Sequence, residues 1–211
     1  MKTGRWFLNS LLIKSADGKS RCRWCDAAPE FLHYHDTEWG FPVGDDRRLF
    51  EKLSLESFQS GLSWRTILAK RENFRKAFHD FEIDRIARFT QRDIDRLLKD
   101  EGIVRHRGKI ESVINNAQRA QALVKQEGSL AAYIWCYEPE VEQLAEPQTE
   151  STSAASIALS KDLKKRGWKF LGPTTVYAFM QAMGLINDHV EGCVSRTEVE
   201  RARKKFKVPV S

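Results

Sequence analysis

Residues 94–113, IDRLLKDEGIVRHRGKIESV, predict two helices joined by a tight turn. The turn centres on Gly102, where we expect a positive φ at the end of the first helix, because glycine has no Cβ to oppose that conformation. The second helix then opens with free backbone N–H groups and with the positive end of its dipole.

The start of this second helix is cationic. Arg105, Arg107 and Lys109 cluster there, next to the turn at Gly102. Such a corner predicts a grip on the phosphates of a nucleic acid, which would position the partner without reading its sequence. An ordinary pair of antiparallel helices with a basic, solvated face explains the same segment equally well.

Apolar residues at helical spacing continue on both sides of this segment. We predict helices over 46–57, 63–79, 82–88, 90–98, about 105–124, 129–136, 156–166 and 174–184. Asp45 with Asp46, Ser63, and Thr90 with Asp93 are the expected start signals. The acidic, proline-containing stretch 138–152 is expected to be a loop. Strand patterns are scarce, so the predicted fold class is all-α.

The composition indicates one domain, or a domain with a small lobe. The chain has 211 residues, of which 41% are hydrophobic, enough for a packed core. Its net charge of +6 favours a polyanionic partner, although many soluble proteins carry a similar charge. No apolar run approaches the roughly 20 residues that span a bilayer.

The N-terminal residues do not have the pattern of a secretory signal. Residues 5–13, RWFLNSLLI, are apolar but short, and KSADGKS follows them instead of a small-residue cleavage site. We therefore expect residues 1–20 to be a loosely attached extension. Without a secretory signal, the four cysteines are expected to stay reduced in the cytoplasm.

Four candidate metal ligands stand near the ends of the chain: Cys22, His35, His189 and Cys193. Two thiolates and two imidazoles suit a closed, tetrahedral zinc site. His189 and Cys193 are four residues apart, about one helical turn, so both can face one ion. Cys25 is a minor alternative, as a ligand or as the partner of Cys22 in a redox pair, and small buried cysteines without any metal are the third interpretation.

One carboxylate stands out in LESFQSGLSWRTIL, residues 55–68. Glu56 lies on a helix otherwise built for the core, where a carboxylate is costly unless it is paired or has a task. An exposed position, or a hydrogen bond to a backbone N–H after Ser63, is the alternative. The rings of Trp24, Tyr34, Trp39 and Trp64 suit stacking on a flat, cationic nucleobase, although each ring alone is more often part of a core.

Together these stretches resemble the DNA-3-methyladenine glycosylase I family, helix-hairpin-helix enzymes that remove alkylated adenine. The resemblance extends from about Arg21 to Cys193. It is carried, in order, by RCRWC (21–25), YHDTEWG (34–40), DDRRLFEKLSLESFQSGLSWRTILAKRENFRKAF (45–78), GIVRHRGKI (102–110) and STSAASIALSKDLKKRGWKFLGPTTVYAFMQAMGLINDHVEGC (151–193).

The resemblance implies a role for each candidate residue. Cys22, His35, His189 and Cys193 would hold a structural Zn²⁺, and Glu56 would contact the base after it leaves the stack. Tyr34 and Trp64, with Trp24 beside them, would line the base pocket. The hairpin at Gly102, Arg105, Arg107 and Lys109 would hold the backbone of double-stranded DNA. A monomer acting on the bacterial nucleoid is the expected form.

The resemblance also implies the reaction. N3-methylated adenine is already cationic and leaves readily, so Glu56 can act by recognising the cation and the developing positive sugar. Many helix-hairpin-helix glycosylases carry a catalytic aspartate, which this family lacks. His106 stands where bifunctional relatives carry a lysine, so we expect base removal without strand cleavage.

The chain departs from the family at several places. Ser57 and Ser60 replace the usual small residues around Gln59, and Val104 stands where many hairpins have a second glycine. The serines leave open a glycosylase for a different damaged base. A non-catalytic zinc-containing DNA-binding protein is the other alternative, but it would have no need of Glu56.

The expected organisation has three parts. Residues 1–20 are the extension, 21–194 the glycosylase domain, and 195–211 a basic tail. Within the domain we expect a zinc lobe from 21–45 and 152–194, and a helix-hairpin-helix core over about 46–137.

Overall fold

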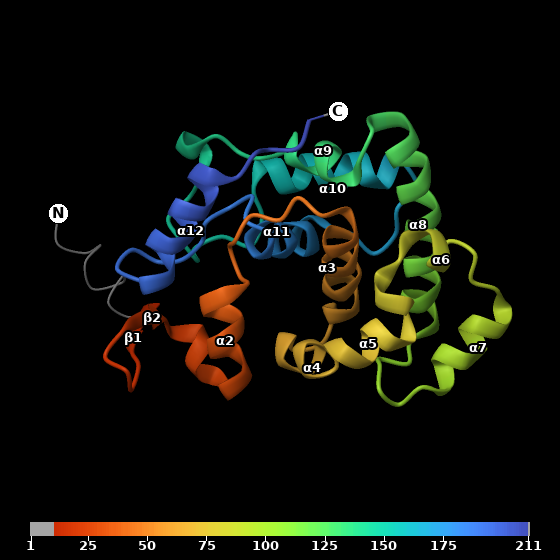
Figure 1. The fold of residues 1–211 in the computed structure, drawn as a ribbon, viewed down its shortest axis with the longest axis horizontal. Coiled ribbons are helices and arrows are strands. Elements are labelled where there is room, and N and C mark those ends of the chain that lie inside the picture. Colours follow the sequence, from red (N-terminus) through yellow and green to blue (C-terminus); the bar gives the residue numbers. More distant parts are fainter. Residues whose placement is uncertain (1–10, 211) are drawn as a thin grey trace. The chain divides into compact units, whose positions relative to one another are not determined.

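The computed structural model describes residues 11–210, and the chain divides into two compact units (Figure 1). The first unit comprises Met1–Pro42, Pro139–Ser151 and Met180–Lys207, and the second comprises Val43–Glu138, Thr152–Phe179 and Val208–Ser211. Residues 152–179, which we expected in the metal-binding lobe, group with the second unit instead. The first unit therefore draws on both ends of the chain but not on α10 (Ala154–Lys165) or on most of α11 (Pro173–Ala182).

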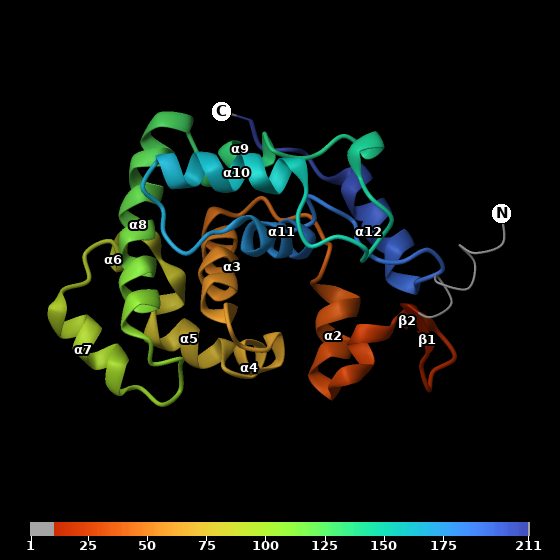
Figure 2. The same ribbon diagram turned by 180° about the vertical axis from the view of Figure 1, so that it is seen from behind.

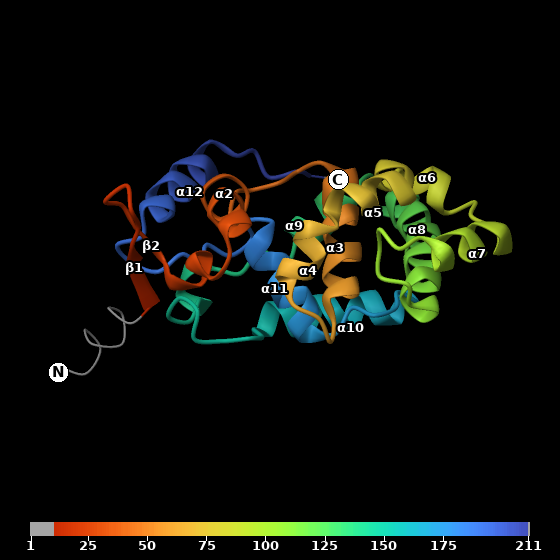
Figure 3. The same cartoon turned by 90° about the horizontal axis from the view of Figure 1, so that it is seen from below.

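The first unit contains a short β-hairpin, which the all-α prediction missed. Strands β1 (Leu12–Lys14) and β2 (Ser20–Cys22) pair antiparallel, with Leu12 opposite Cys22 (Figure 3). Three-residue strands are too short for an alternating pattern to appear in the sequence. The expected loose extension is thus wrong for residues 12–20, while residues 1–10 lie outside the described part.

Helices follow the hairpin and close the unit. The 3-10 turn η1 (Arg23–Ala27) leads into α2 (Pro29–Thr37), and the 3-10 turn η3 (Val141–Gln143) interrupts the acidic loop. Helix α12 (Val194–Lys205) contacts β2. Most of the predicted basic tail is therefore a helix of this unit.

The second unit is a helical cluster, and its order agrees with the sequence analysis (Figure 2). Helix α8 contacts α3, α6, α7 and α9. The elements are α3 (Asp46–Gln59), α4 (Trp64–Ala69), α5 (Arg71–Ala77), η2 (His79–Phe81), α6 (Ile83–Ile86), α7 (Gln91–Lys99), α8 (Arg107–Glu127), α9 (Leu130–Trp135) and α10 (Ala154–Lys165), followed by the start of α11.

The predicted start signals are confirmed, except that the Asp46 side chain caps α9 and not α3. Asp45 accepts a hydrogen bond from the Arg48 N–H at 2.8 Å, and Ser63 accepts one from the Thr66 N–H at 3.2 Å. Thr90 and Asp93 form a capping box at the start of α7.

The single helix expected over 63–79 is wrong. The chain leaves helical geometry at Lys70, with φ −97° and ψ 0°, and forms α4 and α5 instead. The bend packs Phe58, Phe74 and Phe78 together, with ring centroids 4.6 Å apart for the first pair. Aromatic packing therefore outweighs the continuous helical pattern.

None of the helices within residues 11–210 combines the length and apolar character needed to cross a bilayer.

Candidate functional site

The four predicted metal ligands come together in the first unit. Cys22 ends β2, His35 lies on α2, His189 lies in the loop before α12, and Cys193 is the N-cap of that helix. All four are buried, and their ligand atoms lie within 4.8 Å of one another. His189 and Cys193 thus converge through a loop, not through a turn of helix.

The distances within this cluster suit a tetrahedral ion. Cys193 Sγ lies 3.5 Å from both His35 Nε2 and His189 Nδ1, and Cys22 Sγ lies 3.7 Å from His189 Nδ1. Tetrahedral zinc with ordinary bond lengths holds sulfur and nitrogen ligands about 3.5 Å apart. The donor set therefore fits a metal ion in both type and spacing.

The outer nitrogen of each imidazole is also held. His35 Nδ1 donates to Asp36 Oδ1 at 2.7 Å, and His189 Nε2 donates to the Trp39 carbonyl at 2.9 Å. These bonds leave the lone pairs of His35 Nε2 and His189 Nδ1 directed at the cluster. Burial opposes ionisation of Asp36, but hydrogen bonds from Arg21 and His35 prevail and lower its pKa.

The thiols share a negative charge. The pKa of Cys193 is lowered, chiefly because the Cys22 thiol donates a hydrogen bond to the Cys193 thiolate. The same hydrogen bond, together with burial, favours the protonated form of Cys22 and raises the pKa of Cys22. A bound cation would take the place of the shared proton. Cys25 is buried beside this cluster without belonging to it, and burial raises its pKa to about 11.

Glu56 is the main polar feature at the end of α3 in the second unit. It is 5% exposed, and the Lys52 ammonium lies 2.7 Å from its Oε1. The same ammonium lies 3.4 Å from the centroid of the Trp64 ring, at the first residue of α4. Lys52 was missed in the sequence analysis, although its spacing of four residues from Glu56 was a usable signal.

A cavity of about 200 Å³ opens beside Glu56. Its wall is formed by the end of α3, the following turn and the start of α11, with Gln59, Ser60, Gly61, Leu62, Thr174, Thr175 and Ala178. The threonines were missed as site residues. Gly172–Pro173 directly before an apolar helix is the signal that could have placed them at a helix start.

The other predicted base-contacting rings lie in the first unit. Tyr34 and Trp39 are buried, and Trp24 packs edge-on against both and against His35, with centroids 5.0–6.3 Å apart. Trp24 therefore supports the ring of a metal ligand.

The turn between α7 and α8 differs from the prediction at Gly102. This glycine lacks a positive φ. It is required for space, because a Cβ there would lie 2.9 Å from Asp100 Oδ1 and 3.1 Å from Asn73 Cβ. Its N–H donates to Asp100 Oδ1 at 2.8 Å, which tightens the turn.

Lys109 does not lie at the surface, where we expected it as a phosphate contact. It is 6% exposed, and its ammonium donates to the carbonyls of Phe58 and Ser60 at 2.9 and 2.5 Å, where burial lowers its pKa. Its backbone N–H is capped by His106 Nδ1 at 3.2 Å. Lys109 thus satisfies carbonyls at the end of α3 that no helical N–H reaches.

Arg105 and Arg107 remain at the surface. Their side chains are about half exposed, and each makes an ion pair at 3.3 Å with an acid four residues away, Glu101 and Glu111 respectively. Pairs of this kind are weak in water, so a phosphate group can replace the acid.

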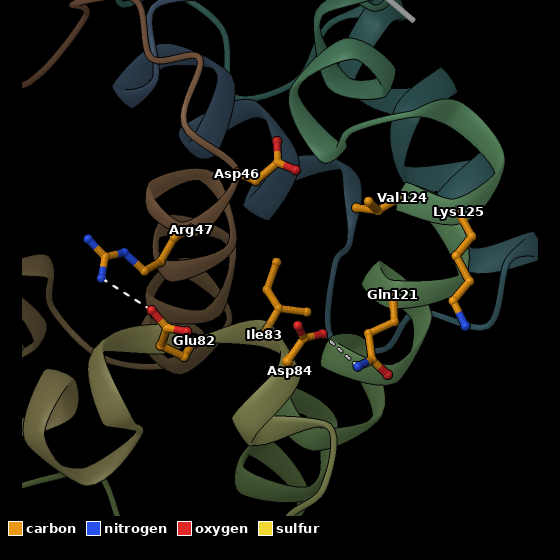
Figure 4. Close-up of a pocket in the computed structure, with 8 residues that line it drawn as sticks. All are labelled: Asp46, Arg47, Glu82, Ile83, Asp84, Gln121, Val124 and Lys125. Atoms are coloured by element: carbon orange, nitrogen blue, oxygen red, sulfur yellow. Dashed lines mark hydrogen bonds and ion pairs between the residues drawn. The ribbon is translucent and has the colours of Figure 1, made fainter.

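A second cavity of about 320 Å³ lies elsewhere in this unit (Figure 4). Its acidic groups and Arg47 already have partners: Arg47 lies 3.6 Å from Glu82, Gln121 donates to Asp84 at 2.7 Å, and Asp46 caps α9 through the N–H groups of Leu130 and Ala131. This arrangement ties α3, α6, α8 and α9 together.

Comparison with known proteins identifies the family. A profile described as Methyladenine glycosylase matches residues 24–196. The chain belongs to the methyladenine glycosylase family. Among its curated methyladenine glycosylase relatives, "DNA-3-methyladenine glycosylase 1" of Escherichia coli K12 is 47% identical over 178 residues, covering 82% of this chain and 95% of that protein.

Solved methyladenine glycosylase structures agree with this assignment. A crystal structure of 3-methyladenine DNA glycosylase I has a TM-score of 0.78 at 46% identity and covers 82% of this chain and 98% of its own. A variant of such an enzyme with one tyrosine changed to phenylalanine, in complex with 3-methyladenine, has a TM-score of 0.76 at 40% identity and covers 80% and 93%. The mostly helical architecture is thus that of the family.

Proposed function

We propose that this chain is a DNA-3-methyladenine glycosylase that hydrolyses the N-glycosidic bond of 3-methyladenine in alkylated double-stranded DNA. The observation that carries this proposal is the buried Glu56 carboxylate beside Trp64, in a chain 47% identical to a curated enzyme of that name. Glu56 is the proposed catalytic residue, and Tyr34, Trp64 and Trp24 are the proposed base contacts.

The chemistry needs few protein groups. The target base leaves the stack, and its positive charge is attracted by the Glu56 carboxylate. As the glycosidic bond breaks, the base takes the bonding electrons and becomes neutral, while positive charge develops on the sugar. A fixed carboxylate stabilises that charge until water adds to the sugar carbon.

We infer that the strand stays intact. Strand cleavage by a lysine needs a free amine to attack the sugar. His106 caps α8, and the neighbouring Lys109 amine is held by two carbonyls, so both are engaged in structural bonds.

We infer that Cys22, His35, His189 and Cys193 hold a structural zinc ion. Four protein ligands leave no open position, as in zinc sites that stabilise a fold. The support is the spacing of the ligand atoms and the tethered outer nitrogens of both imidazoles.

We propose that a helix-hairpin-helix grip on DNA lies at the α7–α8 turn, with Arg105 and Arg107 as phosphate contacts and Gly102 allowing the tight turn. Lys109 is withdrawn from that set. We further propose a monomer that works on the cytoplasmic, nucleoid-associated DNA of a bacterium, since the E. coli relative is bacterial.

A different damaged base is the second candidate substrate. Ser60 lines the cavity beside Glu56, and the buried hydroxyl of Ser57 has no hydrogen-bond partner within the described residues. A hydroxyl of this kind can add a contact to a base.

The test is incubation of the purified protein with methylated duplex DNA. We expect 3-methyladenine in the supernatant, identified by mass spectrometry, and intact strands on a denaturing gel until alkali cleaves the abasic sites. Release of another base would identify the second candidate. Binding without release of any base would identify a non-catalytic DNA-binding protein.

A further inference from the structure

Lys52 places a positive charge inside the proposed base-recognition site. Its side chain is 7% exposed, so the ammonium is largely removed from water. It lies 2.7 Å from Glu56 Oε1 and 3.4 Å from the centroid of the Trp64 ring. An ordinary ion pair between residues four apart on a helix needs neither the burial nor the aromatic ring.

These two contacts are those that a cationic base would make. A methylated purine ring with a positive charge is attracted by a carboxylate and by the face of a tryptophan. We propose that Lys52 is a resident cation, which occupies the charge-recognition position of the site and is exchanged for the cationic base. This inference rests on the proposed function and names a specificity-determining residue for it.

The two cations cannot share the position. Two like charges about 4 Å apart repel strongly where little water separates them. The Lys52 side chain is a flexible four-carbon stem that carries a strongly hydrated ammonium. Rotation about its bonds can therefore move the ammonium into water. Binding of the base therefore moves Lys52 out of the site.

Exchange makes the site selective for charge. A cationic base replaces the ammonium and keeps the Glu56 carboxylate paired. A neutral adenine that displaces Lys52 leaves that carboxylate buried and unpaired, which is unfavourable. Normal adenine is thus rejected for two reasons. Its binding would break the Lys52–Glu56 ion pair, and it carries no charge that could pair with Glu56 instead.

Chemical labelling of lysines tests the exchange directly. The full-length protein is treated with formaldehyde and cyanoborohydride, with or without saturating 3,9-dimethyladeninium, a permanently cationic purine. Methylation at each lysine is followed by peptide mass spectrometry. A ligand normally protects lysines in its site, whereas exchange predicts that Lys52 is labelled severalfold faster when the cation binds.

Lys109 is the matched control. It is equally buried, at 6% exposure, but its ammonium is held by two backbone carbonyls. Its labelling should not respond to the purine. Neutral 9-methyladenine is the ligand control and should leave Lys52 protected.

Lys52→Met provides an independent measurement. Methionine keeps most of the length of the side chain and removes the charge that competes with the base. The variant should bind 3,9-dimethyladeninium more tightly than the wild type, on the order of tenfold, by tryptophan fluorescence.

Some outcomes overturn the proposal. Unchanged or slower labelling of Lys52 with the cation bound, equal or weaker cation binding by folded Lys52→Met, or no cation binding by the wild type would each reject exchange. If Lys52→Met does not fold, the labelling result decides alone. Base release from methylated DNA by the wild type is measured separately, so failure of the proposed function is distinguished from failure of the exchange.

Discussion

At the scale of single residues, Glu56 and Lys109 are both buried charges, and their partners separate their roles. Glu56 is paired with a flexible side chain, Lys52. Lys109 is held by two main-chain carbonyls, which cannot move without unwinding the end of α3. A partner that can leave suits a binding site, and a partner that cannot leave suits a structural bond.

Glu56→Gln should weaken recognition of 3-methyladenine. The substitution keeps size and removes the charge, so affinity for the free base and the excision rate should fall by about 2–4 kcal/mol each. The measurement is release of 3-methyladenine from methylated DNA by the two proteins at matched folding. The double variant Lys52→Met/Glu56→Gln is the control, because it removes the ammonium that Glu56→Gln leaves unpaired. Equal rates and equal base affinity for Glu56→Gln and wild type would make Glu56 structural.

Lys109→Met should lower stability without changing the electrostatics of DNA binding. The carbonyls of Phe58 and Ser60 lose a charged donor, which costs about 1.5–3 kcal/mol in the free energy of unfolding. Urea denaturation measures this loss. The salt dependence of duplex binding should match that of the wild type, and a shallower dependence would restore Lys109 as a phosphate contact.

At the scale of elements, capped helices α7 and α8 stand on either side of the proposed DNA-binding corner. The Thr90–Asp93 capping box begins α7, and the His106 ring begins α8. Between them the chain turns closely against Asn73 of α5, where a Cβ at Gly102 would not fit. The exposed Arg105 and Arg107 flank the His106 cap.

Arg105→Gln, and separately Arg107→Gln, should weaken binding to damaged and undamaged duplexes alike. Each removes one proposed phosphate contact, so the slope of log affinity against log salt should fall by roughly one. Filter binding over a range of salt concentrations measures this. Unchanged affinity and slope would show that these arginines form only a solvated face.

Asp93 should make the stability of α7 depend on acid pH. Its pKa is lowered, chiefly by the hydrogen bond from the Thr90 N–H, so its contribution is present above the unfolded-state pKa and is lost as pH falls through the lower folded-state value. Asp93→Asn should cost about 1 kcal/mol near neutral pH. Thermal unfolding of both proteins from pH 7 to pH 2 should show the difference shrinking on acidification, and a constant difference would contradict the assignment.

At the scale of the whole molecule, the metal cluster joins segments of the first unit that are far apart in the chain. Cys22 and Cys193 are separated by most of the sequence, and fixing them in one cluster removes much of the conformational entropy of the unfolded chain. Gly40 lets the backbone approach the cluster, since a Cβ there would lie 3.2 Å from the His189 ring.

Purified protein should contain about one equivalent of zinc, measured by elemental analysis. Cys193→Ala should lose the metal and much of its thermal stability, because binding of a structural metal is coupled to folding. Cys25→Ala is the control, since Cys25 is also buried but lies outside the cluster. Wild-type protein without metal, or a Cys193→Ala variant as stable as the wild type, would reject the zinc site.

The sequence by itself determined the features that act locally. Helical periodicity, the caps at Asp45, Ser63 and Thr90, and the donor types of the four metal ligands can be read from neighbouring residues, because spacing and hydrogen-bonding capacity do not depend on distant contacts. The motifs also pointed to the family that the comparisons then identified.

Only the tertiary structure decided which partner each charge meets and where the chain bends. Lys109 looked like a surface cation until the end of α3, some fifty residues earlier, supplied its carbonyl partners. The break at Lys70 accompanies the packing of Phe58 on Phe74. The proposed role of Lys52 depends on its contact with the ring of Trp64. Burial and pairing depend on residues far apart in the chain, so no local pattern contains them.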